Sequence, residues 1–272
     1  MVPLLTIYFC MAWWNRKKST DRSRASSPHV QYGAFSDVGR IRNENEDAYG
    51  CFPDEAGRDQ LFVVADGMGG HVRGREASTT AVDAIQRTYF DAPDRAVEAR
   101  LVEAFERSNA QVHTLAEGNE MGEKMGTTGT ALALNGSRAF IAHVGDSRAY
   151  RISEDGCDLL TSDHTMVAQM RREGLLTDQE ARNHPRRGTL TRAIGADPSV
   201  SVDVLEVDGL RPGDRFLLCT DGLADIPEDE LCHVVLAHDS QEACEELVRR
   251  ANEKGGYDNA TAIVVAIAAS AA

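Results

Sequence analysis

Acidic residues beside glycines recur along the chain, and their types and spacing suit metal chemistry. Most follow or precede a short apolar run, where a rigid strand end can present a side chain at a sheet edge. The candidate carboxylates are Glu46, Asp47, Asp66, Asp146, Asp221, Asp225 and Asp258. Gathered at one place they would raise one another's pKa, so such a cluster needs a counter-charge. All-oxygen ligands suit Mg²⁺ or Mn²⁺ and disfavour zinc or copper.

The same Asp-Gly pairs are also common turn sequences, and each aspartate taken alone is explained better as a turn residue. Tens to hundreds of residues separate them, and this spacing does not by itself bring them together. The residues alone therefore leave two interpretations open, a divalent-metal site or a set of unrelated turns.

Apolar runs and helical periodicity predict the elements that would hold these carboxylates. The expected strands cover 60–66, 130–146 (two strands around an Asn135-Gly136 turn), 149–153, 215–221 and 260–268. The expected helices cover 77–89, 97–118 and 240–255, the last with Ser240 as N-cap and Gly255 at its end.

The order of these elements predicts an α+β protein. Strand hairpins at both ends with helix pairs between them favour two antiparallel sheets, packed together and covered by helices, over a parallel βαβ sheet. We therefore expect a four-layer αββα sandwich. In that arrangement 149–153 should extend the sheet begun by the hairpin at 130–146.

The composition narrows the class of protein. The chain has 272 residues, 29 Lys+Arg, 43 Asp+Glu and a net charge of −14, which allows one large domain or two small ones. Residues up to Gln31 hold five basic residues and one acid, so the rest carries 24 − 42 = −18. This balance argues against electrostatic capture of nucleic acid or an anionic membrane.

The N-terminal segment and the cysteines indicate in which cellular compartment the protein works. The apolar stretch 1–14 is shorter than a membrane span, and the basic residues follow it, which is the wrong order for a secretory signal. We expect residues 1–28 to be a disordered extension, or translation to start at Met11, and a weak membrane-surface anchor is the alternative. The six cysteines are scattered, which predicts reduced thiols in a cytoplasmic protein, with Cys219 a buried small hydrophobe.

Eight motifs in order resemble the metal-dependent protein phosphatases, the type 2C serine/threonine phosphatases in their bacterial form. They are SDVGRIRNENEDA (36–48), VVADGMGGH (63–71), GTT (126–128), HVGDSRAY (143–150), LTSDHT (160–165), LTRAIG (190–195), LLCTDGLAD (217–225) and YDNATAIVV (257–265). Each is weak alone, but the ordered set covers the chain from Gln31 to Ala268. The resemblance implies the same αββα sandwich and a catalytic domain over 29–272.

The resemblance also implies roles for the acids. Asp66 would bridge two divalent cations, Mn²⁺ or Mg²⁺, and the Gly67 carbonyl, Asp221 and Asp258 would complete their shells. Glu46 and Asp47 would act through water or directly on one ion. A third, weaker cation would match Asp146, Asp221 and Asp225.

The implied reaction is hydrolysis of phosphoserine and phosphothreonine on proteins by a metal-activated water. Arg42 matches the family arginine that holds the phosphate, although an ion pair with Glu44 or Glu46 is the alternative. Met68 stands where animal members carry an acid-donating histidine. His71 is as readily structural, so the general acid is left unassigned.

The remaining expectations concern the surroundings of the site. Residues 164–188 correspond to a flap beside the cleft, either a basic surface for phosphopeptides or a solvated loop with a short helix that Asp163 caps. Phosphorylated proteins, a serine/threonine kinase and its targets, are the expected partners of a monomer. A non-catalytic pseudophosphatase that only binds a partner is the alternative function.

Overall fold

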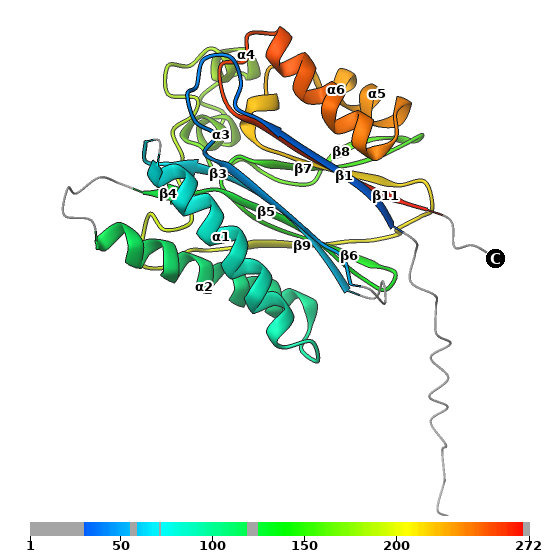
Figure 1. Ribbon diagram of the computed structural model, residues 1–272. Helices are drawn as coiled ribbons and strands as arrows, with labels where there is room; N and C mark the ends of the chain where they lie inside the picture. The colour runs from blue at the N-terminus through cyan, green and yellow to red at the C-terminus, as the bar shows by residue number, and fades with distance from the viewer. Residues whose placement is uncertain (1–29, 55–58, 71, 119–124, 269–272) are drawn as a thin grey trace, which may run out of the picture.

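Two antiparallel sheets lie face to face between two pairs of helices (Figure 1). This computed structural model describes residues 30–54, 59–70, 72–118 and 125–268. One sheet has the strand order β1-β11-β10-β7-β8, and the other has the order β2-β3-β5-β6-β9 with β4 paired to β3. The expected four-layer αββα sandwich is confirmed.

The elements have the following bounds. The strands are β1 (Val30–Asp37), β2 (Asp47–Phe52), β3 (Asp59–Met68), β4 (Gly126–Thr127), β5 (Gly129–Asn135), β6 (Arg138–Val144), β7 (Arg148–Ser153), β8 (Gly156–Leu159), β9 (Asp203–Val207), β10 (Arg215–Cys219) and β11 (Ala260–Ile267). The helices are α1 (Val72–Asp91), α2 (Val97–Glu117), α3 (Met166–Arg172), α4 (Asp178–Arg182), the 3₁₀ turn η1 (Asp221–Leu223), α5 (Glu228–Ala237) and α6 (Ser240–Glu253).

Three apolar layers hold the sandwich together. Alternate residues of each strand point to opposite faces, so one sheet supplies two layers. Phe62 and Phe216 pack between the sheets, Phe105 of α2 packs in the layer between its helix pair and one sheet, and Leu247 of α6 packs in the layer between its helix pair and the other sheet. Because both faces of the central strands are covered, their ends are the places where polar side chains reach solvent.

The strand 149–153 lies in the other sheet from the one expected. As β7 it pairs with β10 and β8, whereas the hairpin β5–β6 belongs to the second sheet. Gly145 makes this crossing with a φ of 113°, and a Cβ there would lie 2.6 Å from the side chain of Thr128. Strand periodicity is the same in both sheets, so the pattern could not distinguish them.

The sequence patterns also did not predict β1, β2, β4, β8, β9 or α5, and the remaining differences are local. Helix α6 is capped by Asp239, whose carboxylate accepts from the backbone of Gln241 and Glu242, and not by Ser240. The flap holds two short helices, α3 and α4, and not one. Helix α3 is capped by Thr165, because the Asp163 carboxylate is engaged by Arg148.

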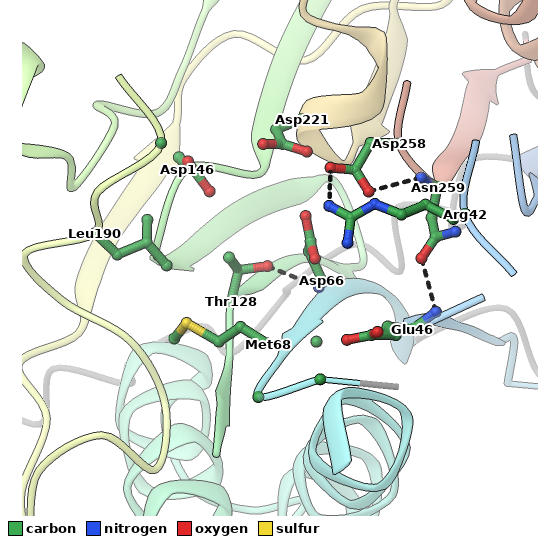
Figure 2. Close-up of a pocket in the computed structure, with 14 residues that line it drawn as sticks. Arg42, Glu46, Asp66, Met68, Thr128, Asp146, Leu190, Asp221, Asp258 and Asn259 are labelled. Atoms are coloured by element: carbon green, nitrogen blue, oxygen red, sulfur yellow. Dashed lines mark hydrogen bonds and ion pairs between the residues drawn. The ribbon is translucent and has the colours of Figure 1, made fainter. Parts of the chain in front are cut away.

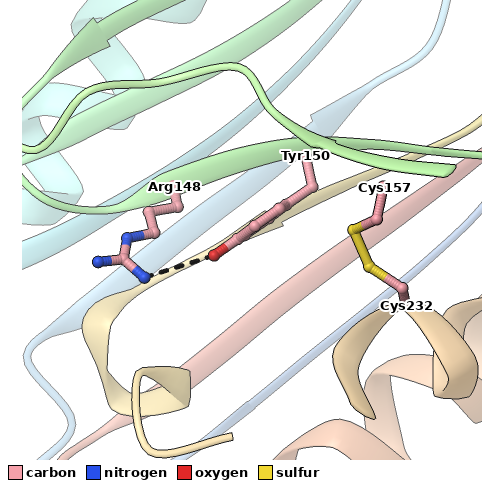
Figure 3. Close-up of a disulfide and its surroundings, with 4 residues drawn as sticks. All are labelled: Arg148, Tyr150, Cys157 and Cys232. Atoms are coloured by element: carbon pink, nitrogen blue, oxygen red, sulfur yellow. Dashed lines mark hydrogen bonds between the residues drawn. A yellow bond between two sulfur atoms is a disulfide. The ribbon is translucent and has the colours of Figure 1, made fainter. Parts of the chain in front are cut away.

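The expectation of reduced thiols is wrong for one pair. Cys157 on β8 and Cys232 on α5 form a disulfide, with their Cα atoms 6.2 Å apart (Figure 3). The two are 75 residues apart, and only the packing of α5 against this sheet brings them together. Cys219 is buried as predicted, and burial raises the pKa of its thiol to about 12.

The predicted disordered extension 1–28 lies outside the described residues, as do Met11 and His71. Helices long and apolar enough to cross a membrane do not occur in the described part of the chain.

Candidate active site

A cavity of about 250 Å³ opens where strand ends and loops of both sheets meet (Figure 2). Most of the sequence-predicted site residues line it. Its lining comprises Arg42, Glu46, Asp66, Gly67, Met68, Gly69, Gly70, Thr128, Asp146, Gly188, Leu190, Asp221, Asp258 and Asn259. The interpretation of these acids as unrelated turn residues is therefore wrong, because the fold brings five of them to one place.

Asp66 stands near the end of β3, which lies between β2 and β5 in its sheet. Its backbone N–H donates to Thr128 Oγ1 at 2.8 Å, and its carbonyl accepts from the Thr127 hydroxyl and the Thr128 backbone N–H. Thr128 in turn shares a hydrogen bond of 2.7 Å with the hydroxyl of Ser147. These bonds fix the backbone that carries the Asp66 carboxylate.

Glu46 reaches the cavity from the loop between β1 and β2, and Asn259 holds that loop. The Asn259 amide oxygen accepts from the Glu46 backbone N–H at 2.8 Å, and its NH₂ donates to the carbonyls of Val38 and Glu44, both at 2.9 Å. All these bonds are made by one side chain, which is 5% exposed. Asn259 therefore ties the start of β11 to the loop that carries both Arg42 and Glu46.

Gly74 in the first turn of α1 lets Glu46 and Gly67 approach the helix closely. A Cβ at Gly74 would lie 2.0 Å from Glu46 Oε2 and 2.8 Å from the Gly67 carbonyl oxygen. A Cβ at Gly67 would in turn lie 2.0 Å from the Gly74 carbonyl oxygen. No side chain larger than hydrogen fits at either position, so the two oxygens predicted to bind metal share a space that the glycines leave open.

Arg42 and Asp258 meet across the mouth of the cavity. Arg42 Nη2 donates to Asp258 Oδ2 at 2.7 Å, and the other Asp258 oxygen accepts from the Asn259 backbone N–H at 2.9 Å. The Arg42 side chain remains 48% exposed. The ion-pair partner of Arg42 is therefore Asp258, and not Glu44 or Glu46 as in the alternative prediction. The rest of the guanidinium group faces the cavity (Figure 2).

Two of the predicted ligands do not line the cavity. Asp47 begins β2 opposite Asp66, and its Oδ2 accepts from the hydroxyls of Thr220 at 2.8 Å and Thr261 at 2.6 Å. Asp225 is exposed beyond η1. Asp47 is thus engaged by the two threonines, and Asp225 is exposed outside the cavity lining.

The electrostatics of the site follow from buried carboxylates facing one another. Burial, and then the charges of Asp47, Asp221 and other acids, raise the pKa of Asp66 well above its usual range. Burial and the charge of Asp221 raise the pKa of Asp146 to about 7. Burial raises the pKa of Asp47 to about 7, although the hydrogen bonds from the two threonine hydroxyls act to lower it. The pKa of Asp221 is raised by burial and Asp258.

These residues fit divalent cations in chemistry and in charge. The donors are carboxylate and carbonyl oxygens, and Asp221 Oδ1 is buried with no hydrogen-bond partner in the protein. An unsatisfied anionic oxygen among like charges is costly unless a cation faces it. Within the described ranges, no three His, Cys, Asp or Glu side chains are arranged so that they could hold a metal ion as they stand. The carboxylates surround a space that cations would fill.

Asp146 lies on the far side of the cavity, in the loop between β6 and β7. Next to it, Arg148 donates to both oxygens of Asp163, at 2.9 and 2.6 Å. This bidentate pair joins the start of β7 to the base of the flap. Gly188 and Leu190, at the other end of the flap, line the cavity.

Comparison with known proteins agrees with this geometry. Residues 42–264 match the family described as Protein phosphatase 2C. The chain belongs to the protein phosphatase 2C family. The serine/threonine phosphatase Stp of Listeria innocua is 36% identical over 236 residues, which cover 85% of this chain and 93% of that one. The protein phosphatase PhpP of Streptococcus pneumoniae is 35% identical over 243 residues, 88% of this chain and 98% of that one.

Solved structures of this family share the fold. The crystal structure of the Mycobacterium tuberculosis serine/threonine phosphatase PstP/Ppp has a TM-score of 0.78 and 32% identity, covering 88% of this chain and 99% of that one. The catalytic domain of PstP in complex with two manganese ions has a TM-score of 0.76 and 31% identity, covering 88% and 99%. Members of the protein phosphatase 2C family thus bind divalent metal in this sandwich.

Two residues that hold the site were not singled out from the sequence. Asn259 lies inside the YDNATAIVV motif, and Gly74 lies outside every motif. The signal for Asn259 was its position next to Asp258, where a buried amide can satisfy several backbone groups. The role of Gly74 comes from a contact 28 residues away with Glu46, and the local sequence gives no sign of it.

Proposed function

We propose that this chain is a metal-dependent protein phosphatase that hydrolyses phosphoserine and phosphothreonine on proteins. The observation that carries the proposal is the gathering of Asp66, Asp146, Asp221 and Asp258 beside Arg42 in one cavity. An arginine supplies bidentate hydrogen bonds to a phosphoryl group, and the acids supply oxygen ligands for cations. The names of the relatives support the same activity.

In this proposal Asp66, the Gly67 carbonyl, Glu46, Asp221 and Asp258 hold two divalent cations. Bound there, the cations supply neutralisation of phosphoryl charge and activation of water. Arg42 binds two phosphoryl oxygens with its open fork and orients the phosphorus. Asp47 holds Thr220 and Thr261 behind the ligands and takes no direct part.

Several finer points belong to the same proposal. Mn²⁺ is the preferred cation of the two considered, since a structural neighbour holds two manganese ions. A third, weaker cation would use Asp146 and Asp221, without the exposed Asp225. Residues 29–272 form the catalytic domain, with residues 164–188 as its flap. The chain acts as a monomer on targets of a serine/threonine kinase.

The leaving group receives its proton from water in this proposal. Met68 lines the cavity where animal members carry a histidine. Among the described residues that line the cavity there is no histidine, and the acids there are assigned to metal.

The test is phosphate release from a phosphothreonine peptide by the purified chain with Mn²⁺. We expect turnover that chelator abolishes and that Asp66→Asn lowers by at least about 100-fold, since removal of a charge-stabilising group costs that much in other enzymes. Asp158→Asn is the matched control, because Asp158 is exposed on β8.

Three outcomes would each contradict a part of the proposal. Folded, Mn²⁺-saturated protein without turnover would favour the pseudophosphatase alternative. Full activity in the presence of chelator would exclude the metal mechanism. A deletion strain without any rise in phosphoserine or phosphothreonine would remove the kinase-opposing role.

A further inference from the structure

The exposed apolar side chains of the described residues include two whose immediate chain neighbours line the candidate active site. Tyr257 is 66% exposed and Ile41 is 64% exposed, comparable with Val72 at 69% and Leu175 at 63%, whereas the other exposed large apolar residues lie between 37 and 44%. Isolated surface apolar residues are ordinary and need no explanation. These two are unusual because each is the immediate neighbour of a cavity residue, Ile41 of Arg42 and Tyr257 of Asp258.

Backbone hydrogen bonds join the two loops that carry these side chains. The N–H groups of Arg40 and Ile41 both donate to the Gly256 carbonyl, at 2.8 and 3.2 Å. The Arg42–Asp258 ion pair closes the same junction from the cavity side. The two loops that carry Ile41 and Tyr257 are therefore joined beside the cavity, and we call these two side chains the apolar rim.

The ring of Tyr257 is held although it is exposed. A Cβ on Gly255 would lie 2.2 Å from a ring atom of Tyr257, so the ring rests on the bare backbone of that glycine. Gly255 has a φ of 137°, a conformation that other residues rarely adopt. A ring that is placed in advance loses little conformational freedom when a ligand packs on it.

The geometry points to a substrate preference: the apolar rim binds an apolar side chain that flanks the phosphorylated residue of a protein substrate. This inference rests on the proposed function, because the phosphoryl group is taken to bind at Arg42. Consecutive Cα atoms are about 3.8 Å apart in any chain, so a residue one or two positions from the phosphorylated one reaches the neighbours of Arg42. Burial of apolar surface there favours leucine or phenylalanine over glycine or a charged residue.

The test uses phosphothreonine peptides that are identical except for one residue. A glycine-flanked parent is compared with peptides carrying a single leucine, glutamate or lysine at each of the two positions on either side. We expect leucine, at one position or more, to raise kcat/KM by about five- to tenfold over glycine, a modest gain because the rim is open on one side. Equal rates for all peptides, or a preference for a charged residue at every position, would overturn the inference.

Variants then locate the effect. Ile41→Ser and Tyr257→Ser should each reduce the leucine-to-glycine ratio of kcat/KM toward one. Leu236→Ser is the matched control, since Leu236 is an exposed apolar residue on α5 and its removal should leave the ratio unchanged. A ratio that survives in the Ile41→Ser/Tyr257→Ser double variant would place the preference elsewhere and overturn the inference.

Hydrolysis of p-nitrophenyl phosphate by the unmodified chain separates this inference from the proposed function. That substrate has no flanking residues. If p-nitrophenyl phosphate is hydrolysed and all peptides are hydrolysed at the same rate, the inferred role of the apolar rim is wrong but the proposed phosphatase function stands. Loss of turnover on all substrates would remove the proposed function itself.

Discussion

Arg42 is bonded to Asp258 through one edge of its guanidinium, at 2.7 Å, from a loop 216 residues earlier in the chain. The residue proposed to hold phosphate thereby also orients a carboxylate proposed to hold metal. Hydrogen bonding and charge from Asp258 raise the pKa of Arg42 above its usual value. In the proposed function, phosphate binding and metal binding are therefore expected to be coupled through the Arg42 side chain.

The first prediction concerns this pair. Arg42→Ala should lower kcat/KM for a phosphopeptide by about 100-fold or more, because a donor to the phosphoryl group and the orienting bond to Asp258 are lost together. Arg42→Lys should recover only part, since an ammonium lacks the planar fork. Competitive inhibition by inorganic phosphate should weaken in both variants. Unchanged phosphate inhibition in Arg42→Ala would contradict the binding role.

The second prediction concerns Asn259, which supports the loop of Glu46 without touching the proposed metals. Asn259→Ala should weaken Mn²⁺ affinity by about 10- to 100-fold, the range measured for residues that orient metal ligands elsewhere. Titration calorimetry with Mn²⁺ measures the change directly. Asn135→Ala, in the β5–β6 hairpin, is the control with unaltered affinity. Equal affinities in both variants would show that the loop holds its place without Asn259.

The third prediction concerns the contact between α1 and Glu46. Gly74→Ala would place a methyl group in the space of Glu46 Oε2, so Mn²⁺ affinity and turnover should both fall by about tenfold or more. The control is Gly156→Ala, because nothing lies within 4 Å of a Cβ at that position. If Gly74→Ala binds Mn²⁺ like the parent, the Glu46 carboxylate is not part of the metal site.

The fourth prediction concerns the cost of the acidic cluster without metal. Asp66→Asn should raise the thermal unfolding midpoint in chelator, because it removes one of several buried like charges. The parent protein should gain about 2–3 kcal/mol at Mn²⁺ 100-fold above its Kd, and the variant clearly less. Calorimetric scans with and without Mn²⁺ measure both effects. A lower midpoint for the metal-free variant would mean that Asp66 is stabilised by contacts within the protein.

The fifth prediction concerns pH. Burial and the neighbouring ring of His164 lower the pKa of His143 to about 4. Between pH 6.5 and 4 the unfolded state binds the proton and the folded state does not, so this residue's contribution to stability is lost as pH falls. The loss should approach about 3 kcal/mol. Urea unfolding of the parent and His143→Asn isolates it, because the acidic cluster titrates in both. Parallel pH profiles would contradict the prediction.

The order of motifs was enough to predict the layers of the fold and most of the cavity lining. Asp66, Asp221 and Asp258 end or begin strong apolar strands, and such strands are the most readable part of a sequence. Strand β2 was missed because DAYGCF is short and holds a glycine. The sheet of β7 was misassigned because one glycine turn at Gly145 decides it, and periodicity does not report on pairing.

The parts of the site that escaped prediction depend on contacts between distant residues. Asp225 shares a motif with Asp221, yet it follows the 3₁₀ turn η1, is exposed and does not line the cavity. Asp239 and Ser240 are both good helix caps, so their order could not be decided from propensity. The Cys157–Cys232 pairing depends on how α5 packs, and scattered cysteines do not encode it.

That disulfide closes a covalent ring whose chain runs from β8 through the whole flap to α5 (Figure 3). Asp221 and Leu190, which line the cavity, are both carried on the ring. A protease that cuts the flap would therefore release no fragment while the bridge is intact. The cut would be visible on a denaturing gel only after the disulfide is reduced. Until then both halves of the cut flap would stay covalently joined to the rest of the protein.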